Sequence, residues 1–161
     1  MRFFRCPCMF QKAGYRLRCG NASEIRRCGK FSVRWKMPRD SLLLTKYRTG
    51  ISYNALVAGF TEIGETLEET VAREVLEETG VQVRNIRYYR SQPWGIASDI
   101  LAGFYCEADG SGEIRMDASE LKYAAWVKRE EIELQPDDAS LTNEMMQMFR
   151  DGKIHAEDLR K

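Results

Sequence analysis

The segment from Thr66 to Gly80 constrains the fold more than any other part of the sequence. Thr66 and Glu69 stand at the two positions of a capping box, and Gly80 stands where a helix C-cap is expected. Between them, apolar residues recur at helical spacing, at Leu67, Val71, Val75 and Leu76. These signals together predict a helix over residues 67–79.

Short apolar segments on both sides of this helix predict strands. The expected strands are 41–47, 53–60, 86–91, 100–107, 113–117 and 123–128, with a hairpin turn at 109–112 and a second, Met-rich helix at 141–149. Strands that are interrupted by one helix and closed by another are typical of a mixed sheet between helices. The expected fold class is therefore α/β (α+β).

Length and composition limit the class of protein. The chain has 161 residues, of which 43% are hydrophobic and 30% charged, which favours one globular domain over a disordered, collagenous or disulfide-rich chain. No apolar run approaches the roughly 18 residues of a membrane-spanning helix, and the first residues lack the apolar core of a secretion signal. We therefore expect a cytoplasmic protein with reduced cysteines and no membrane partner.

Charge divides the chain in two. Residues 1–39 hold 11 Lys and Arg residues against one acidic residue, whereas residues 40–161 hold 14 basic and 23 acidic residues. Such asymmetry is typical of a basic arm that binds nucleic acid or phosphate, or of a segment with a separate origin. The predicted organisation is a basic leader, 1–39, followed by one domain, 40–161.

Three glutamates share one face of the predicted helix. Glu74, Glu77 and Glu78 stand at positions i, i+3 and i+4, where their mutual repulsion is unfavourable unless a positive charge compensates it. An acidic helix face is often simply solvated, but clustered carboxylates also suit Mg²⁺ or Mn²⁺. Such an ion binds phosphate oxygens and activates water, which points to hydrolysis of a phosphate-containing substrate.

Two further charged residues frame the helix. Glu65 precedes it and Arg73 lies within it, and an ion pair between them would hold the loop that precedes the helix. That loop is flanked by Gly59 and contains Gly64, which permit unusual backbone angles.

The spacing of these residues resembles the Nudix box, G-x5-E-x7-R-E-U-x-E-E-x-G-U, where U is a bulky aliphatic residue. All nine defined positions agree: Gly59, Glu65, Arg73, Glu74, Val75, Glu77, Glu78, Gly80 and Val81. The resemblance covers nearly everything from about Ser41 onward. It implies an α/β/α sandwich and a metal-dependent attack of water on a nucleoside diphosphate derivative. It makes Glu74 and Glu78 metal ligands and leaves Glu77 as a ligand or as the residue that handles the attacking water.

A second motif is similar to the SQPW signature of the NADH pyrophosphatase subgroup. Ser91, Gln92, Pro93 and Trp94 follow the helix. The amide can pair with a base edge and the indole can stack, although a lone Trp is more often a packing residue. The subgroup continues with PFPxS, whereas this chain has Gly-Ile-Ala-Ser at 95–98, which leaves the preference for NADH open.

Two more correspondences follow from the resemblance. Ala58 and Phe60 match the subgroup's AGF element, which implies that the Ala58 carbonyl is a metal ligand and that the Phe60 ring lies against the substrate base. Glu120 aligns with a downstream glutamate that completes the metal site, although an isolated surface glutamate is usually only solvated.

The resemblance therefore implies a homodimeric enzyme that splits NADH or NAD⁺ into nicotinamide mononucleotide and AMP, and that removes NAD caps from RNA. Two alternatives stay open. One is a Nudix hydrolase for ADP-ribose or another nucleoside diphosphate derivative. The other is a non-catalytic protein that binds RNA or phosphate through its basic leader.

The leader resembles a zinc ribbon with altered spacing. Its candidate zinc ligands are Cys6, Cys8, Cys19 and Cys28, but one residue separates the first pair and eight separate the second, where a zinc knuckle needs two. Free or partly ligating thiols are the favoured interpretation. From 22 to 39 the resemblance fails and only 31–35 alternates like a strand. If the first strand of the sheet is absent, the sheet has an exposed edge.

Overall fold

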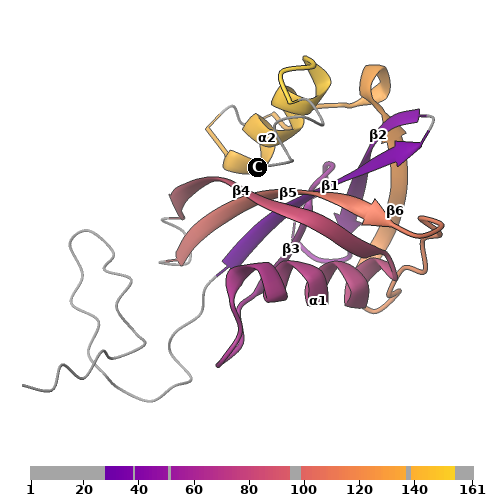
Figure 1. The fold of residues 1–161 in the computed structure, drawn as a ribbon. Coiled ribbons are helices and arrows are strands. Elements are labelled where there is room, and N and C mark those ends of the chain that lie inside the picture. Colours follow the sequence, from indigo (N-terminus) through magenta and orange to yellow (C-terminus); the bar gives the residue numbers. More distant parts are fainter. Residues whose placement is uncertain (1–27, 38, 51, 95–98, 137–138, 155–161) are drawn as a thin grey trace, which may run out of the picture.

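The computed structural model describes residues 28–37, 39–50, 52–94, 99–136 and 139–154, with backbone only for 28–37, 39 and 99. Its elements follow one another along the chain as shown in Figure 1. They are β1 (Cys28–Met37), β2 (Arg39–Tyr47), β3 (Val57–Phe60), α1 (Leu67–Thr79), β4 (Gln82–Trp94), β5 (Asp99–Asp109), β6 (Leu121–Lys128), the short helix η2 (Arg129–Glu131) and α2 (Leu141–Arg150). Neither α-helix in these ranges is both long and apolar enough to cross a membrane.

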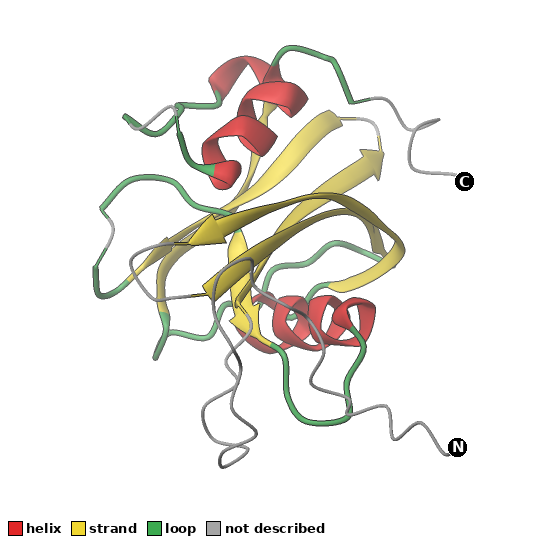
Figure 2. Cartoon of the chain, turned by 90° about the vertical axis from the view of Figure 1, so that its left-hand side faces the viewer, coloured by secondary structure: helices red, strands yellow, loops and turns green. Residues whose placement is uncertain are grey.

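Six strands of the described ranges form one mixed sheet. The order is β4-β5-β1-β2-β6, with β3 also paired to β1. The β1 and β5 strands run parallel, whereas β1–β2, β1–β3, β2–β6 and β4–β5 are antiparallel. Helices α1 and α2 cover opposite faces of this sheet (Figures 1 and 2), so the predicted α/β/α sandwich is confirmed.

Strand β1 lies in the middle of the sheet. Its backbone pairs with β5 on one side and with β2 and β3 on the other. A strand is therefore present before residue 40, and the condition under which the sheet would expose an edge there is not met. The ten residues of β1 and Arg39 of β2 precede residue 40 and belong to the sheet by backbone pairing, while the division into leader and domain stays a prediction. Cys6, Cys8 and Cys19 lie outside the described residues, and Cys28 is described only through its backbone at the start of β1.

Three consecutive leucines of β2 pack into two hydrophobic cores, one on each face of the sheet. Leu42 and Leu44 face α2, Leu43 faces α1, and all three are fully buried. This alternation follows from the pleat of a strand, and the run is continuously apolar because helices cover both faces of the sheet. The α1-side core also holds Val57, Val71, Val75, Val81 and Phe104, and the α2-side core holds Leu56, Leu101, Met145, Met146 and Phe149.

Helix α1 has the predicted bounds and the predicted caps. The Thr66 hydroxyl accepts a hydrogen bond from the Glu69 N–H, and the Glu69 carboxylate accepts one from the Thr66 N–H at 2.7 Å. Gly80 ends the helix in the left-handed region, at φ 71°, where a side chain would be strained.

Two strand predictions need correction. The strand expected at 53–60 begins only at Val57, because the preceding chain contacts β2 through a single bridge between Ala55 and Thr45. No strand forms at 113–117. Instead, the N–H groups of Arg115 and Asp117 each donate at 2.8 Å to carbonyls at the C-terminal end of α1, so this segment caps the helix.

Candidate active site

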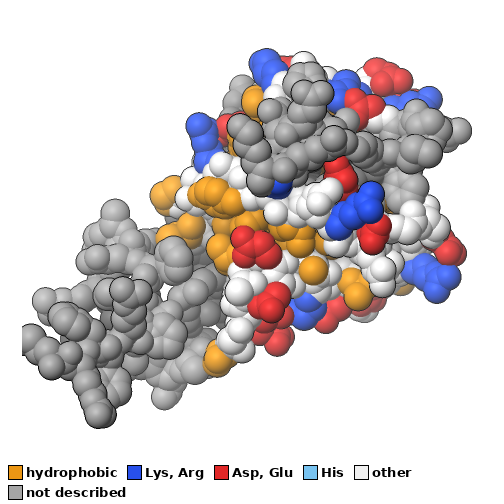
Figure 3. Space-filling view, in the orientation of Figure 1, with side chains coloured by type: hydrophobic (Ala, Val, Ile, Leu, Met, Phe, Trp, Pro, Cys, Tyr) orange, Lys and Arg blue, Asp and Glu red, His pale blue; other side chains and the backbone are white. Residues whose placement is uncertain are grey.

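The three glutamates of α1 have different surroundings. Glu78 is buried, Glu74 has 14% of its side chain exposed, and Glu77 has 59% exposed. Acidic side chains are visible over α1 in the space-filling view (Figure 3). The acidic face is therefore not uniformly solvated: two of its three carboxylates are turned into the protein.

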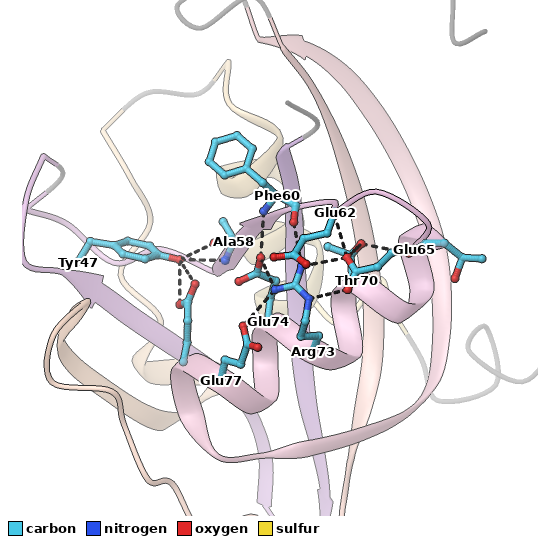
Figure 4. Close-up of polar contacts among 11 residues, drawn as sticks. Tyr47, Ala58, Phe60, Glu62, Glu65, Thr70, Arg73, Glu74 and Glu77 are labelled. Carbon is cyan, nitrogen blue, oxygen red and sulfur yellow. Dashed lines mark hydrogen bonds and ion pairs between the residues drawn. The ribbon is translucent and has the colours of Figure 1, made fainter. Parts of the chain in front are cut away.

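Arg73 joins the glutamates to the preceding loop. Its Nε and Nη2 donate to the two carboxylate oxygens of Glu65, at 2.6 and 3.0 Å, and Nη2 also donates to the Phe60 carbonyl at 2.9 Å. Its Nη1 lies 3.0 Å from an oxygen of Glu74 and 3.0 Å from an oxygen of Glu77 (Figure 4). The planar guanidinium suits such a set of contacts, and the predicted Glu65–Arg73 ion pair is confirmed.

The Glu65 carboxylate organises the loop between β3 and α1. Besides Arg73, it accepts hydrogen bonds from the Glu62 N–H and the Thr70 hydroxyl, each at 3.0 Å. The hydrogen bond from Arg73, followed by that from the Glu62 backbone, lowers the pKa of Glu65 to about 2. The same pairing with Glu65 raises the pKa of Arg73. Both groups are therefore charged at neutral pH.

Glu74 lies against β3 at a glycine. Its carboxylate accepts a hydrogen bond from the Phe60 N–H at 3.1 Å. A Cβ atom on Gly59 would overlap this carboxylate, so only glycine leaves room for it. Burial raises the pKa of Glu74, and the nearby Arg73 opposes that rise. The box glycine thus makes space for a specific side chain.

Glu78 is linked to β3 through Tyr47, a residue that the sequence analysis did not identify. The Tyr47 hydroxyl accepts from the Ala58 N–H at 2.9 Å (Figure 4). It also lies 3.1 Å from a Glu78 carboxylate oxygen. The sequence does contain one signal that bears on the position of Tyr47. Leu43 and Tyr47 are four residues apart on one strand, so period-two alternation places both on the α1 side.

The donor set fits a hard divalent cation. Glu74 and Glu78 supply carboxylate oxygens, and Ala58, next to Gly59 on β3, supplies a carbonyl. Across the described side chains, no group of three or more His, Cys, Asp and Glu residues is gathered closely enough to hold a metal. Proteins nevertheless usually bind Mg²⁺ through only one or two carboxylates, and waters and substrate phosphates complete the coordination.

Glu120 lies at the same end of the sheet. It immediately precedes Leu121, which pairs with Tyr47, and its carbonyl accepts from the Arg48 N–H at 2.9 Å. Its side chain is exposed. The structure therefore brings Glu120 to the neighbourhood of Tyr47.

The predicted substrate residues separate into two groups. Phe60 ends β3 beside the glutamates, with 44% of its surface exposed. Figure 4 shows its ring standing apart from their carboxylates. The SQPW residues instead lie within β4, where Ser91 and Pro93 are exposed and Trp94 packs against the α2-side core. For Trp94 this agrees with the packing interpretation.

The Gln92 amide is already engaged. Its Nε2 donates to the Ala139 carbonyl at 2.6 Å, and its Oε1 accepts from the Leu141 N–H at 2.8 Å. Gln92 therefore holds the N-terminal end of α2 against β4, which the sequence analysis did not foresee.

Comparisons with known proteins agree with this geometry. The model of the NUDIX domain family matches residues 32–149. The chain is 41% identical over 111 residues to proteins named NAD-capped RNA hydrolase NudC from Citrobacter koseri and from Escherichia coli O1:K1. That match covers 67% of this chain and 42% of each relative, so the chain matches less than half of their length.

Solved structures share the fold. A NUDIX hydrolase from Nitrosomonas europaea aligns with a TM-score of 0.66 at 20% identity, covering 78% of this chain and 70% of that one. The NUDIX domain of NrtR from Shewanella oneidensis, solved with ADP ribose, aligns with a TM-score of 0.65 at 14% identity, covering 88% and 96%. With the NUDIX match extending over residues 32–149, the chain belongs to the Nudix hydrolase family.

Proposed function

We propose that this protein is a metal-dependent hydrolase that cleaves the pyrophosphate bond of NADH or NAD⁺ to nicotinamide mononucleotide and AMP. The observation that carries the proposal is the arrangement of Glu74 and Glu78, each connected to β3 next to the Ala58 carbonyl. Similarity to relatives named NAD-capped RNA hydrolase supports a dinucleotide substrate, either free or at the 5′ end of RNA.

Glu74, Glu78 and the Ala58 carbonyl would hold Mg²⁺ or Mn²⁺, and Glu120 would join them through water. A bound divalent ion neutralises diphosphate charge and makes a water molecule more acidic. Arg73 holds Glu74 and Glu77 at a fixed spacing through Nη1. Glu77 is the most exposed of the three, so it serves either as a further ligand or as the group that takes a proton from the attacking water.

Phe60 would contact the substrate base. Its backbone N–H and carbonyl hold Glu74 and Arg73, while its ring is left exposed. An exposed ring beside a diphosphate site can stack on a base of either nucleotide half. Ser91, Gln92, Pro93 and Trp94 remain the proposed second wall of the pocket, by resemblance to the subgroup.

ADP-ribose hydrolysis is the second candidate. The sequence at 95–98 departs from the subgroup motif, and the Gln92 amide, which the motif would offer to a base, is bonded to the N-terminal end of α2. Both observations weaken recognition of a second base and favour a substrate with only one.

The deciding experiment measures AMP release from NADH, NAD⁺ and ADP-ribose, and release of nicotinamide mononucleotide from NAD-capped RNA. Each substrate is tested with Mg²⁺, with Mn²⁺ and with a chelator. We expect metal-dependent release that is fastest from NADH, and loss of at least 100-fold in a Glu78→Gln variant. Glu68→Gln, which neutralises an exposed carboxylate in the first turn of α1, is the matched control and keeps full activity. Fastest release from ADP-ribose would select the second candidate.

Absence of turnover, together with steeply salt-dependent RNA binding, would instead support the non-catalytic alternative. Three further expectations need separate measurements. The first is whether the thiols are free or bind zinc, with Cys6, Cys8, Cys19 and Cys28 as the candidate ligands. The second is that the protein forms a homodimer, and the third is that it is cytoplasmic. Metal analysis, native mass and cell fractionation measure them in turn.

A further inference from the structure

Tyr47 connects two elements of the candidate site. It is the last residue of β2 and is half-buried. Its hydroxyl oxygen lies 2.9 Å from the Ala58 nitrogen, 3.3 Å from the Ala58 carbonyl oxygen, and 3.1 and 3.4 Å from the two carboxylate oxygens of Glu78. One hydroxyl therefore touches β3 and α1 at the two residues to which the metal is assigned.

The donor and acceptor groups involved determine the direction of each hydrogen bond. A tyrosine hydroxyl has one proton to donate and lone pairs to accept. The Ala58 N–H can only donate, so the hydroxyl oxygen accepts from it. Its own proton is drawn to the Glu78 carboxylate, which is closer than the Ala58 carbonyl and would be ionised as a metal ligand. The result is a chain of hydrogen bonds from Ala58 through Tyr47 to Glu78.

The backbone around Tyr47 supports a specific placement. The pairing of β2 with β6 shifts register between Lys46 and Tyr47. Lys46 pairs with Tyr123 and Tyr47 pairs with Leu121, so the extra residue of this irregularity is Lys122 on β6. Strand β2 therefore keeps its alternation, and Tyr47 stays on the same face of the sheet as Leu43, towards α1.

We propose that Tyr47 is a positioning residue, whose hydroxyl holds the Glu78 carboxylate beside the Ala58 carbonyl so that both oxygens can bind one divalent ion. This proposal rests on the proposed function, because it takes these oxygens to be the metal ligands. Groups that orient a ligand by hydrogen bonding typically contribute 10–100-fold to metal affinity. Phenylalanine has the same ring without the hydroxyl, so the proposed role belongs to the oxygen atom of Tyr47 alone.

The test is a Tyr47→Phe variant of the full chain, which keeps the ring and removes the hydroxyl. Mn²⁺ affinity is measured by direct titration without substrate, and thermal unfolding and the dependence of kcat and KM on Mg²⁺ are measured beside it. We expect the Mn²⁺ dissociation constant to rise about tenfold. Saturating metal should restore most of kcat, because the ligands themselves remain. Tyr123→Phe, at a partly exposed tyrosine whose ring lies under Lys46, is the matched control and should leave the affinity unchanged.

An unchanged or lower dissociation constant in Tyr47→Phe would overturn the positioning role, whatever the wild-type activity. Conversely, wild-type protein that binds Mn²⁺ through Glu78 but hydrolyses no dinucleotide would remove the proposed function and leave the positioning role standing. Wild-type protein that binds no Mn²⁺ would overturn both.

Discussion

The Arg73 guanidinium faces the Glu65 carboxylate along one edge, with Nε 2.6 Å from one carboxylate oxygen and Nη2 3.0 Å from the other. This contact joins the middle of α1 to the loop that follows β3. The remaining nitrogen of Arg73 lies 3.0 Å from both Glu74 and Glu77. The ion pair between Arg73 and Glu65 therefore also sets where two of the site's carboxylates stand.

Stability should depend on pH through Glu65. Folding lowers its pKa from an ordinary value of 4.5 to about 2. A group with a lowered folded-state pKa stabilises the fold fully above its unfolded-state pKa and loses that contribution as the pH falls through the folded value. We therefore expect Glu65→Gln to lower the free energy of unfolding by about 1–2 kcal/mol at pH 7, a value that allows for partial exposure to solvent.

This difference should shrink as the pH falls from 4.5 towards 2, and denaturant unfolding at a series of pH values measures it. Glu68→Gln, which neutralises an exposed glutamate on the same helix, is the control and should leave stability unchanged at pH 7. A Glu65→Gln difference that stays constant down to pH 2 would show that the charge of Glu65 is not its source.

Much of α1 and its charged face follows from local sequence. Thr66 and Glu69 complete a capping box within four residues, and Gly80 ends the helix by its own backbone preference, so no distant contact is needed to predict the bounds. The Glu65–Arg73 pair spans only eight residues and was also predictable.

The features that were missed depend on distant parts of the chain. Residues 113–117 have a strand-like pattern, but the N–H groups of Arg115 and Asp117 donate to carbonyls at the end of α1. Strand β1 alternates like a strand over 31–35, but its place between three other strands depends on backbone pairing with distant parts of the chain. Tyr47 and Gln92 contact Glu78 and Leu141, 31 and 49 residues away. Such partners are set by the tertiary fold and leave no short-range signal.

Gly59→Ala should impair catalysis while sparing stability. The added methyl group would occupy the space of the Glu74 carboxylate, which is the end of a flexible side chain and can move away. We expect kcat/KM to fall at least tenfold, since displacement of a catalytic group by about 1 Å can cost 100-fold, with a loss of less than about 1 kcal/mol in the free energy of unfolding. Steady-state kinetics and denaturant unfolding measure the two effects.

A double-mutant cycle provides the control for Gly59→Ala. If the methyl group acts only by displacing Glu74, then adding it to Glu74→Gln should change kcat/KM little further. If the two substitutions instead lower kcat/KM by independent and additive amounts, Gly59 acts through some other contact.

Gln92→Ala should mainly destabilise the protein. The truncation leaves the Ala139 carbonyl and the Leu141 N–H without the amide that now bonds both. Two such hydrogen bonds contribute about 1–3 kcal/mol together, and we expect a loss of that size in the free energy of unfolding. Gln82→Ala, at an exposed glutamine on the same strand, should cost less than about 0.5 kcal/mol. Unchanged stability with a raised KM for NADH would instead assign Gln92 to base recognition.

Phe60→Ala should separate substrate binding from the chemical step. The backbone groups of Phe60 hold Glu74 and Arg73, and they remain after the ring is removed. The ring itself is 44% exposed, so its loss should cost little stability. Stacking of a base on an aromatic ring contributes about 1–3 kcal/mol, which predicts a KM for NADH that is at least about fivefold higher with kcat nearly unchanged. Ile63→Ala, at the 85% exposed residue of the neighbouring loop, is the control and should leave KM unaltered. A fall in kcat at constant KM would mean that the ring supports the catalytic groups and does not contact the substrate.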